Sequence, residues 1–266
     1  MTRDIATVFQ NAQQDGRVVL VGYLPAAFPD PKRYLEIVAA AASAGLDILE
    51  IGLPVKNPYL DGSVIRAALQ TIGQQRITPD QALEIGAEAV QAAEIVGLPM
   101  LYPQTLLEIG TQWLFEQCNS LNLPAVLLAG ASMVEWIKFA LLAQARHIQP
   151  IGFIRANADI ATIKSIVNYS QGFLYIQSYE GKTGERASFG KELEEHLARV
   201  RQFARPFGQP LVVGFGVQHV EDVGRLLAMG ADGVVIGTAL VKAASQGSQA
   251  VYQLVSQLAS ATVIRS

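Results

Sequence analysis

The chain has 266 residues, of which 50% are hydrophobic and 16% are charged, and its formal net charge at pH 7 is −3. This length fits one large α/β domain, because α/β barrels run to about 200–250 residues or more as one unit. The charge provides no basic surface for nucleic acid and no polybasic patch for a membrane, so the expected partners are small neutral or anionic metabolites.

Residues 1–16 predict an amphipathic helix that places Ile5, Val8 and Phe9 on one side. This segment lacks the apolar run and the cleavage site of a signal peptide. No stretch of roughly 18 apolar residues without charges or helix breakers occurs elsewhere in the sequence. We therefore expect a cytoplasmic protein with no membrane span.

Short β-branched runs then alternate with amphipathic helical stretches, which is typical of βαβ units around a parallel sheet. Strands are predicted at residues 18–24, 47–53, 99–102, 125–130, 150–155, 172–178, 210–216 and 233–237. Helices are predicted between them, among others at 31–45, 80–97, 133–147, 191–204 and 220–230. The strands read as continuous apolar runs, as strands covered on both faces should.

Eight strands, each followed by a helix, favour an α/β fold that closes into a (β/α)8 TIM barrel with an extra N-terminal helix. An open doubly wound sheet usually carries a glycine-rich fingerprint after its first strand, and this chain has none there. Without a linker or a low-complexity tract, we expect residues 1–266 to form a single domain. The longest loops follow the second and sixth strands, at 54–63 and 179–190, at the end of a barrel where active sites lie.

The second unit places Glu50 inside an apolar strand and Asp61 on the loop that follows. A buried carboxylate is costly, and apolar walls would raise its pKa, so that it could exchange protons near neutral pH. Two alternatives stay open at this point: Glu50 could pair with a core lysine or arginine, and Asp61 could simply form a turn before Gly62.

The seventh and eighth strands end in small residues, with Gly214 and Gly216 on one and Gly237 and Thr238 on the other. Barrels often bind phosphate between these two loops, through backbone N–H groups and the N-terminus of a short helix. The alternative is a pair of tight turns without a ligand.

The residue pattern argues against a metal site and against the catalytic triad of a hydrolase. His147, His196 and His219 fall on predicted helices or their starts, and the lone cysteine, Cys118, excludes a disulfide framework and a cysteine-based metal cluster. No nucleophile elbow of the serine hydrolases is present. No metal site and no cofactor are predicted.

Together the motifs resemble the tryptophan synthase α-subunit family. They are GYLPAAFPD at 22–30, LEIGLPVKNPYLDG at 49–62, KTG at 182–184, GFGV at 214–217 and ADGVVIGTALVK at 231–242, in the family's order over nearly the whole chain. The resemblance implies a lyase that cleaves indole-3-glycerol phosphate to indole and glyceraldehyde 3-phosphate by a retro-aldol reaction.

The resemblance also implies roles for individual residues. Glu50 matches the family's general acid/base, Asp61 matches the carboxylate that engages the indole N–H, and Thr183 matches a threonine that closes on both. The indole slot is expected to be walled by Tyr23, Ile65, Met100, Leu127, Ala129, Phe153, Tyr175, Thr183 and Phe215. The phosphate is expected at Gly184, Gly216, Gly237 and Thr238.

The chain departs from the family's usual pattern at several loop positions. Asn57 and Gly130 stand where an aspartate is usual, Gln104 and Thr105 replace an Asn-Pro, and Tyr179, Glu180 and Lys182 alter the sixth loop. In the family the positions after strands two to four largely meet a β subunit, so we expect weak coupling to a tryptophan synthase β subunit. Glu135, Glu180 or Lys182 could instead re-form the network with a co-adapted partner.

Other functions also stay open. The chain could be a stand-alone lyase in secondary metabolism, could accept a related indole-glycerol phosphate, or could act mainly as a regulatory partner of a pyridoxal-phosphate-dependent β subunit. A phosphosugar isomerase would share the phosphate loops, but it would need a catalytic Glu or Lys on strand six or seven, and neither strand has one.

Overall fold

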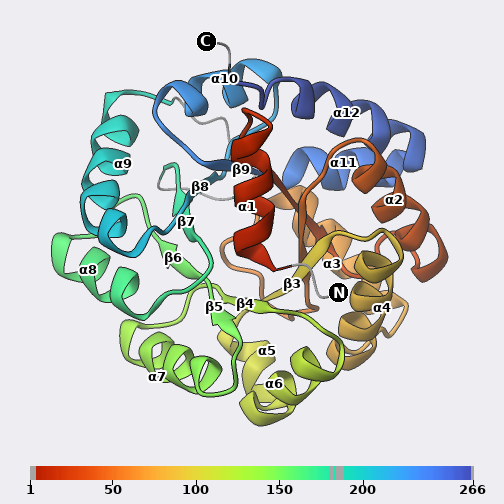
Figure 1. Cartoon of the computed structure of the whole chain (residues 1–266). Helices are drawn as coiled ribbons and strands as arrows, with labels where there is room; N and C mark the ends of the chain where they lie inside the picture. The colour runs from red at the N-terminus through yellow and green to blue at the C-terminus, as the bar shows by residue number, and fades with distance from the viewer. Residues whose placement is uncertain (1–3, 180–182, 184–188, 265–266) are drawn as a thin grey trace.

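A closed ring of parallel strands forms the centre of the molecule (Figure 1). The computed structural model describes residues 4–179, 183 and 189–264, and within them nine strands form one sheet in the order β5-β4-β3-β2-β1-β9-β8-β7-β6. The strands are β1 (Val19–Pro25), β2 (Ile48–Gly52), β3 (Val96–Leu101), β4 (Ala125–Leu128), β5 (Gln149–Pro150), β6 (Gly152–Ile154), β7 (Leu174–Gln177), β8 (Leu211–Gly214) and β9 (Gly233–Ile236).

The predicted fifth strand is the segment that closes the ring. It is divided at Ile151 into β5, which pairs with β4, and β6, which pairs with β7. The Ile151 N–H donates to the Val126 carbonyl at 2.9 Å, so the division does not break the connection to β4. All eight predicted strands are therefore present, and the predicted TIM barrel is confirmed.

The start of the third strand was predicted wrongly. Residues 80–97 were expected to be helical, but the helix α4 (Pro79–Ala92) ends earlier and β3 begins at Val96. Apolar Ile95 and Val96 continue the helical periodicity, so the pattern alone does not reveal the boundary. Pairing decides it, because Val96 is in register with Ile48 at the first residue of β2.

Helices form the outer layer around the strands (Figure 1). They are α2 (Pro31–Ser43), α3 (Ser63–Gln74), α4, α5 (Pro103–Ile109), α6 (Thr111–Ser120), α7 (Met133–Gln144), α8 (Ile160–Tyr169), α9 (Lys191–Ala204), α10 (Val220–Ala228), α11 (Thr238–Gln246) and α12 (Ser248–Ser260), with a 3-10 turn η1 (Arg205–Phe207). None of the helices in the described ranges is both long and apolar enough to cross a bilayer.

Several helix starts follow directly from capping residues in the sequence. The Asp30 side chain accepts the Arg33 N–H at 3.0 Å, and Pro31 occupies the first helical position of α2. Ser132 and Glu135 form a reciprocal capping box at the start of α7. These caps place the helix starts directly after the loops that leave the carboxyl ends of the strands.

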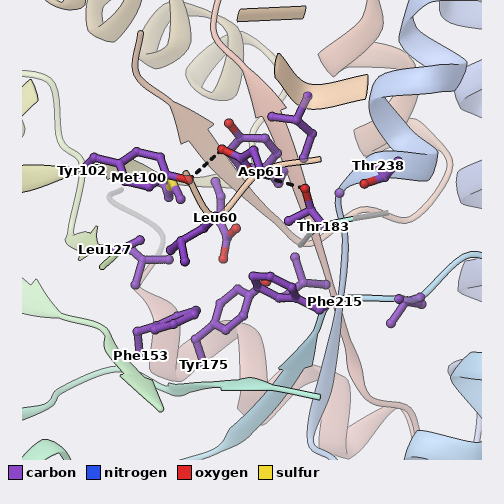
Figure 2. Close-up of a pocket in the computed structure, with 18 of the residues that line it drawn as sticks. Leu60, Asp61, Met100, Tyr102, Leu127, Phe153, Tyr175, Thr183, Phe215 and Thr238 are labelled. Carbon is purple, nitrogen blue, oxygen red and sulfur yellow. Dashed lines mark hydrogen bonds between the residues drawn. The ribbon is translucent and has the colours of Figure 1, made fainter. Parts of the chain in front are cut away.

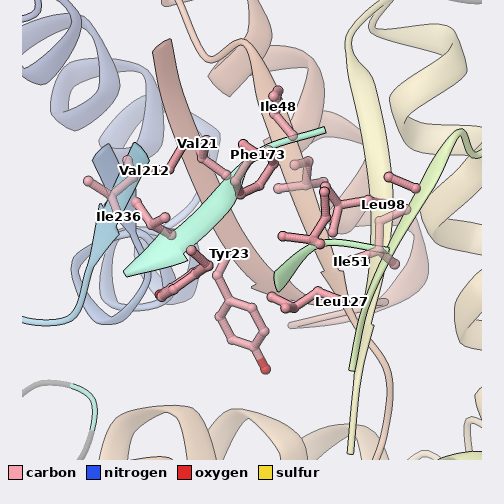
Figure 3. Packing of buried hydrophobic residues seen from close by; sticks show 14 of the residues in the cluster. Val21, Tyr23, Ile48, Ile51, Leu98, Leu127, Phe173, Val212 and Ile236 are labelled. Atoms are coloured by element: carbon pink, nitrogen blue, oxygen red, sulfur yellow. The ribbon is translucent and has the colours of Figure 1, made fainter. Parts of the chain in front are cut away.

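The barrel interior is filled with apolar side chains (Figure 3). Val21, Ile48, Leu98 and Val212 come from four different strands and are all fully buried. Since both faces of each strand are covered, the strands have to be continuous apolar runs, as the sequence predicted. Apolar side chains of the described strands therefore fill the centre of the barrel.

The predicted N-terminal helix, α1 (Ile5–Gln14), lies across the amino ends of the strands (Figure 1). Ile5 is fully buried, and the Phe9 ring lies 6.0 Å from the ring of Phe173, which immediately precedes β7. The Gln149 side chain donates to Asp4 at 3.3 Å at the same end. With this end covered, the carboxyl ends of the strands remain for a site.

Two carboxylates brace the amino ends. Asp47, just before β2, accepts both Arg17 guanidinium N–H groups at 2.8 and 2.9 Å and the Leu20 N–H of β1 at 2.8 Å. Asp232, just before β9, accepts Arg201 at 2.7 Å and the Leu211 N–H of β8 at 2.7 Å. Each carboxylate thus joins its own strand to a neighbour.

We predict that Asp47→Ala lowers the free energy of unfolding by about 1.5–3 kcal/mol, because it leaves the buried Leu20 N–H without its acceptor and removes two hydrogen bonds of the Arg17 guanidinium. Asp15 pairs with the same guanidinium at 3.5 Å but its side chain is 63% exposed. Asp15→Ala should therefore cost at most about 1 kcal/mol. Urea unfolding of both variants measures the difference, and equal losses would contradict the bracing role of Asp47.

Candidate active site

A pocket lies at the carboxyl ends of the strands, with about 630 Å³ of empty space that includes its opening to solvent (Figure 2). Strands on all sides of the barrel contribute to it, among them Tyr23 from β1, Glu50 from β2 and Tyr175 from β7. The full lining is Tyr23, Glu50, Leu60, Asp61, Ile65, Met100, Tyr102, Leu127, Ala129, Phe153, Tyr175, Thr183, Phe215, Gly216, Val217, Gln218, Val235, Gly237 and Thr238. The site residues predicted from the sequence line this pocket with two exceptions: Gly184 lies outside the described residues, and Gly214, at the end of β8, is covered by the Tyr175 side chain and is not in the lining.

One side of the pocket is aromatic. The Tyr175 ring centroid lies 5.2 Å from that of Phe153 and 6.2 Å from that of Phe215, which it meets edge-on. Met100 and Leu127 lie across from these rings (Figure 2). Such tilted and edge-on arrangements are the geometry that aromatic groups prefer, so the pocket suits a flat aromatic ligand.

Glu50 is a deeply buried acid of the pocket. It lies in register between Tyr23 on β1 and Leu98 on β3, and it is only 2% exposed. Its Oε1 atom has no hydrogen-bond partner, and no ion pair to it occurs in the described part of the chain. Burial raises the pKa of Glu50 to about 8. Within that part of the chain, the alternative of a core ion pair is therefore wrong.

Asp61 is equally buried but has partners. The Tyr102 hydroxyl donates to its Oδ2 at 2.7 Å, and the Thr183 hydroxyl lies 3.4 Å from its Oδ1; the two approach from opposite sides (Figure 2). Burial raises the pKa of Asp61 to about 6, while these hydrogen bonds oppose the shift. Its N–H also closes a turn with Pro58 at 3.1 Å, so the turn alternative holds for the backbone while the side chain faces the pocket.

Thr183 joins the two long loops. Its hydroxyl accepts the Gly62 N–H at 2.8 Å, and its own N–H donates to the Leu60 carbonyl at 3.2 Å. A Cβ atom at position 62 would lie 2.0 Å from the Thr183 carbonyl oxygen. Only glycine therefore permits this approach, and the contact holds the segment around Asp61 against the loop after β7.

Gly216, Gly237 and Thr238 border another part of the pocket, which we call the notch. Gly216 follows β8 with a left-handed φ of +79°, and Gly237 directly precedes α11, whose first residue is Thr238. The first N–H groups of a helix have no partner within the helix and carry a partial positive charge, so they suit a phosphate. The notch and the aromatic wall thus flank the two carboxyl groups.

Sequence reasoning missed several lining residues, above all Tyr102. It is 2% exposed and follows β3 directly, at the start of α5. A tyrosine at the carboxyl end of an apolar strand was a usable signal, because a buried phenol needs a hydrogen-bond partner. The other residues missed are Leu60, Val217, Gln218 and Val235.

The chain matches the family model for the tryptophan synthase alpha chain over residues 9–263. It belongs to the tryptophan synthase alpha chain family. Members of this family are lyases that cleave indole-3-glycerol phosphate to indole and glyceraldehyde 3-phosphate. The family and the lyase class predicted from the sequence motifs are confirmed.

Similar proteins include the tryptophan synthase alpha chain of Actinobacillus pleuropneumoniae serotype 3, 30% identical over 95% of this chain and 94% of the relative. The alpha chain of Chloroflexus aurantiacus is 32% identical over 89% of this chain and 88% of the relative. A structure of Mycobacterium tuberculosis tryptophan synthase superposes with a TM-score of 0.89 at 24% identity, covering 100% of both chains. The tryptophan synthase α2β2 complex of Pyrococcus furiosus gives a TM-score of 0.81 at 26% identity, covering 91% of this chain and 98% of that one.

Two of the positions at which a departure from the usual family pattern was expected, Gly130 and Tyr179, have contacts next to this pocket. Gly130 follows β4, and its carbonyl accepts the Tyr59 hydroxyl at 2.7 Å. The Tyr179 ring packs edge-on 6.3 Å from that of Phe215. Glu135, one candidate for re-forming a partner network, is engaged in the cap of α7. Glu180 and Lys182 lie outside the described residues.

The raised pKa values predict how stability depends on pH. Protonated Glu50 supports folding below its ordinary pKa of 4.5, and this contribution is lost as the pH rises through about 8. The stability of the wild type should therefore fall across this range relative to Glu50→Gln, which cannot ionise. At about 1.4 kcal/mol per pKa unit the change amounts to several kcal/mol.

Asp61→Asn is the internal comparison, because its difference from the wild type should develop between 3.8 and about 6 and then level off. Urea unfolding at a series of pH values measures both curves. If the difference in unfolding free energy between the wild type and Glu50→Gln does not change with pH, the pKa of Glu50 is not raised by folding.

Proposed function

We propose that this chain performs the family's retro-aldol cleavage in the pocket, with Glu50 as the general acid/base and Asp61 as the charge-stabilising group. One observation carries the proposal. A buried carboxyl group whose Oε1 atom has no hydrogen-bond partner among the described residues faces the same cavity as a carboxyl group held by hydrogen bonds. Their different surroundings separate their pKa values, which is how two acids take different roles.

Glu50 begins the reaction protonated and delivers its proton to C3 of the indole ring. Positive charge then grows on the indole nitrogen, and the Asp61 carboxylate stabilises it while accepting the N–H. The Glu50 carboxylate next removes the proton of the adjacent hydroxyl group. The carbonyl forms, the carbon–carbon bond breaks, and its electron pair returns to the indole ring, so that Glu50 is protonated again.

The remaining pocket residues bind the two ends of the substrate. The apolar and aromatic walls, including Phe153, Tyr175 and Phe215, hold the indole ring. The phosphate occupies the notch at Gly216, Gly237 and the start of α11, where the helix N-terminus favours an anion. Gly184 belongs to the same proposed phosphate site by its position in the KTG motif.

We predict that Glu50→Gln lowers kcat by about 100-fold or more, because the amide keeps the shape of the side chain but cannot exchange the proton. Asp61→Asn should also cause a large loss, since a neutral amide stabilises less positive charge. Indole release from indole-3-glycerol phosphate measures both. Near-normal turnover of the Glu50→Gln variant would remove this residue from the acid/base role.

The pH profile of kcat/KM provides a second readout in the same assay. It should be bell-shaped, falling below about 6 as Asp61 takes up a proton and above about 8 as Glu50 loses its own.

We also propose a β subunit as a weakly coupled partner. Structures similar to this chain come from tryptophan synthase assemblies, one of them an α2β2 complex. Leu107 on α5 and Val134 on α7 are 86% and 64% exposed, and such apolar side chains favour a covering partner at this end of the barrel. Weak coupling is proposed because Asn57 and Gly130 lack the carboxylates usual there, and because the loops are joined within this chain through Thr183.

We predict measurable cleavage by the purified chain alone and less than ten-fold activation when a β subunit is titrated in. Coupling between sites is typically about 1–3 kcal/mol, so the loss of two charge-assisted hydrogen bonds of about 1.5–3 kcal/mol each is enough to abolish it. Activation of ten-fold or more would contradict weak coupling and would favour a network re-formed with a co-adapted partner.

A further inference from the structure

One hydrogen bond joins two loops on the rim of the pocket. The Tyr59 hydroxyl donates to the Gly130 carbonyl at 2.7 Å, across 71 positions of sequence. Tyr59 belongs to the loop between β2 and α3 that carries Asp61, and Gly130 belongs to the loop between β4 and α7. The bond therefore ties the Asp61 loop to the loop after β4, whereas Thr183 ties it to the loop after β7.

Gly130 is matched to Tyr59 in shape. Its backbone is left-handed, with a φ of +77°, and a Cβ atom there would lie 1.8 Å from the Tyr59 hydroxyl oxygen. Any other residue at position 130 would force the tyrosine to move. On the family pattern, an aspartate is usual at position 130. The glycine that replaces it in this chain leaves the space that the Tyr59 hydroxyl occupies.

The ring of Tyr59 continues the connection inwards. It meets the ring of Tyr102 edge-on at 5.2 Å, and Tyr102 donates the 2.7 Å hydrogen bond to Asp61. Tyr102 is 2% exposed, whereas Tyr59 is 44% exposed. An outer tyrosine anchored at the rim therefore packs against the inner tyrosine that touches the carboxylate.

We propose that Tyr59 is a positioning residue that acts on Asp61 through Tyr102, and that Gly130 is the anchor that makes this possible. The inference rests on the cleavage proposed above. With Tyr59 fixed to Gly130, the Tyr102 ring keeps the orientation in which its hydroxyl points at Asp61. Small errors in the position of such a group are costly in rate, because charge stabilisation depends on its geometry.

The test compares Tyr59→Phe with Tyr252→Phe in the indole-release assay. Phenylalanine at position 59 keeps the ring and removes only the bond to Gly130. Tyr252, on α12 and outside the pocket, is also 44% exposed and serves as the matched control. Tyr59→Phe should lower kcat about five-fold, which corresponds to about 1 kcal/mol, with KM and the melting temperature close to wild type. Tyr252→Phe should change none of them.

Two further variants separate positioning from general stability. Gly130→Ala, which places a methyl group where the Tyr59 hydroxyl lies, should lower kcat at least as much as Tyr59→Phe. In a Tyr102→Phe background, Tyr59→Phe should lower kcat by less than about two-fold further, because the effects of residues that act as a unit are not additive. If the loss of kcat in the double variant equals the product of the losses in the two single variants, Tyr59 does not act on Asp61 through Tyr102.

The remaining outcomes are equally decisive. An unchanged kcat in Tyr59→Phe, or a loss that appears only in KM or tracks a fall in melting temperature, would overturn the positioning role. Glu50→Gln in the same assay keeps the two proposals apart. If it loses turnover as predicted while Tyr59→Phe behaves like Tyr252→Phe, only the positioning role fails; if it retains turnover, the proposed acid/base chemistry fails.

Discussion

The burial of Glu50 without a partner for its Oε1 atom is the constraint on which the arrangement of this protein depends. An ionised carboxylate in that position costs several kcal/mol, and protonation avoids most of the cost, which is why burial raises its pKa to about 8. The rest of the cost is tolerated because the surrounding strands form a ring whose core is packed mainly with apolar side chains. A smaller or open sheet would expose this carboxyl group to water.

The amino end of the barrel contains stabilising contacts between strands, and the carboxyl end contains the pocket. At the amino end, α1 covers the strands, and Asp47 and Asp232 hold neighbouring strands together through paired hydrogen bonds. At the carboxyl end, buried acids, a glycine-bordered notch and long loops replace such braces. Because stabilising contacts at one end are independent of side chains at the other, the pocket can hold unfavourable groups without loss of the fold.

Strand pairing fixes the position of Glu50, whereas contacts with two other loops fix the position of Asp61. Its loop is held on one side by Thr183, through Gly62 and Leu60, and on the other by the contact of Tyr59 with Gly130. Both attachments depend on a glycine that lets another group approach closely. A loop anchored at two points loses little entropy on binding a ligand, so its carboxylate needs little rearrangement before it acts.

The sequence by itself determined the strands, the N-terminal helix, the buried position of Glu50 and the glycines of the notch, because each depends on local apolar runs or on motifs short enough to read directly. It could not place the start of β3, where helical periodicity runs into the strand, or identify Tyr102 as the partner of Asp61. The meaning of Gly130 was also out of reach, since it depends on Tyr59. Only the tertiary structure decided these contacts, because closure of the barrel brings residues 71 positions apart within hydrogen-bond distance, and no local pattern encodes that approach.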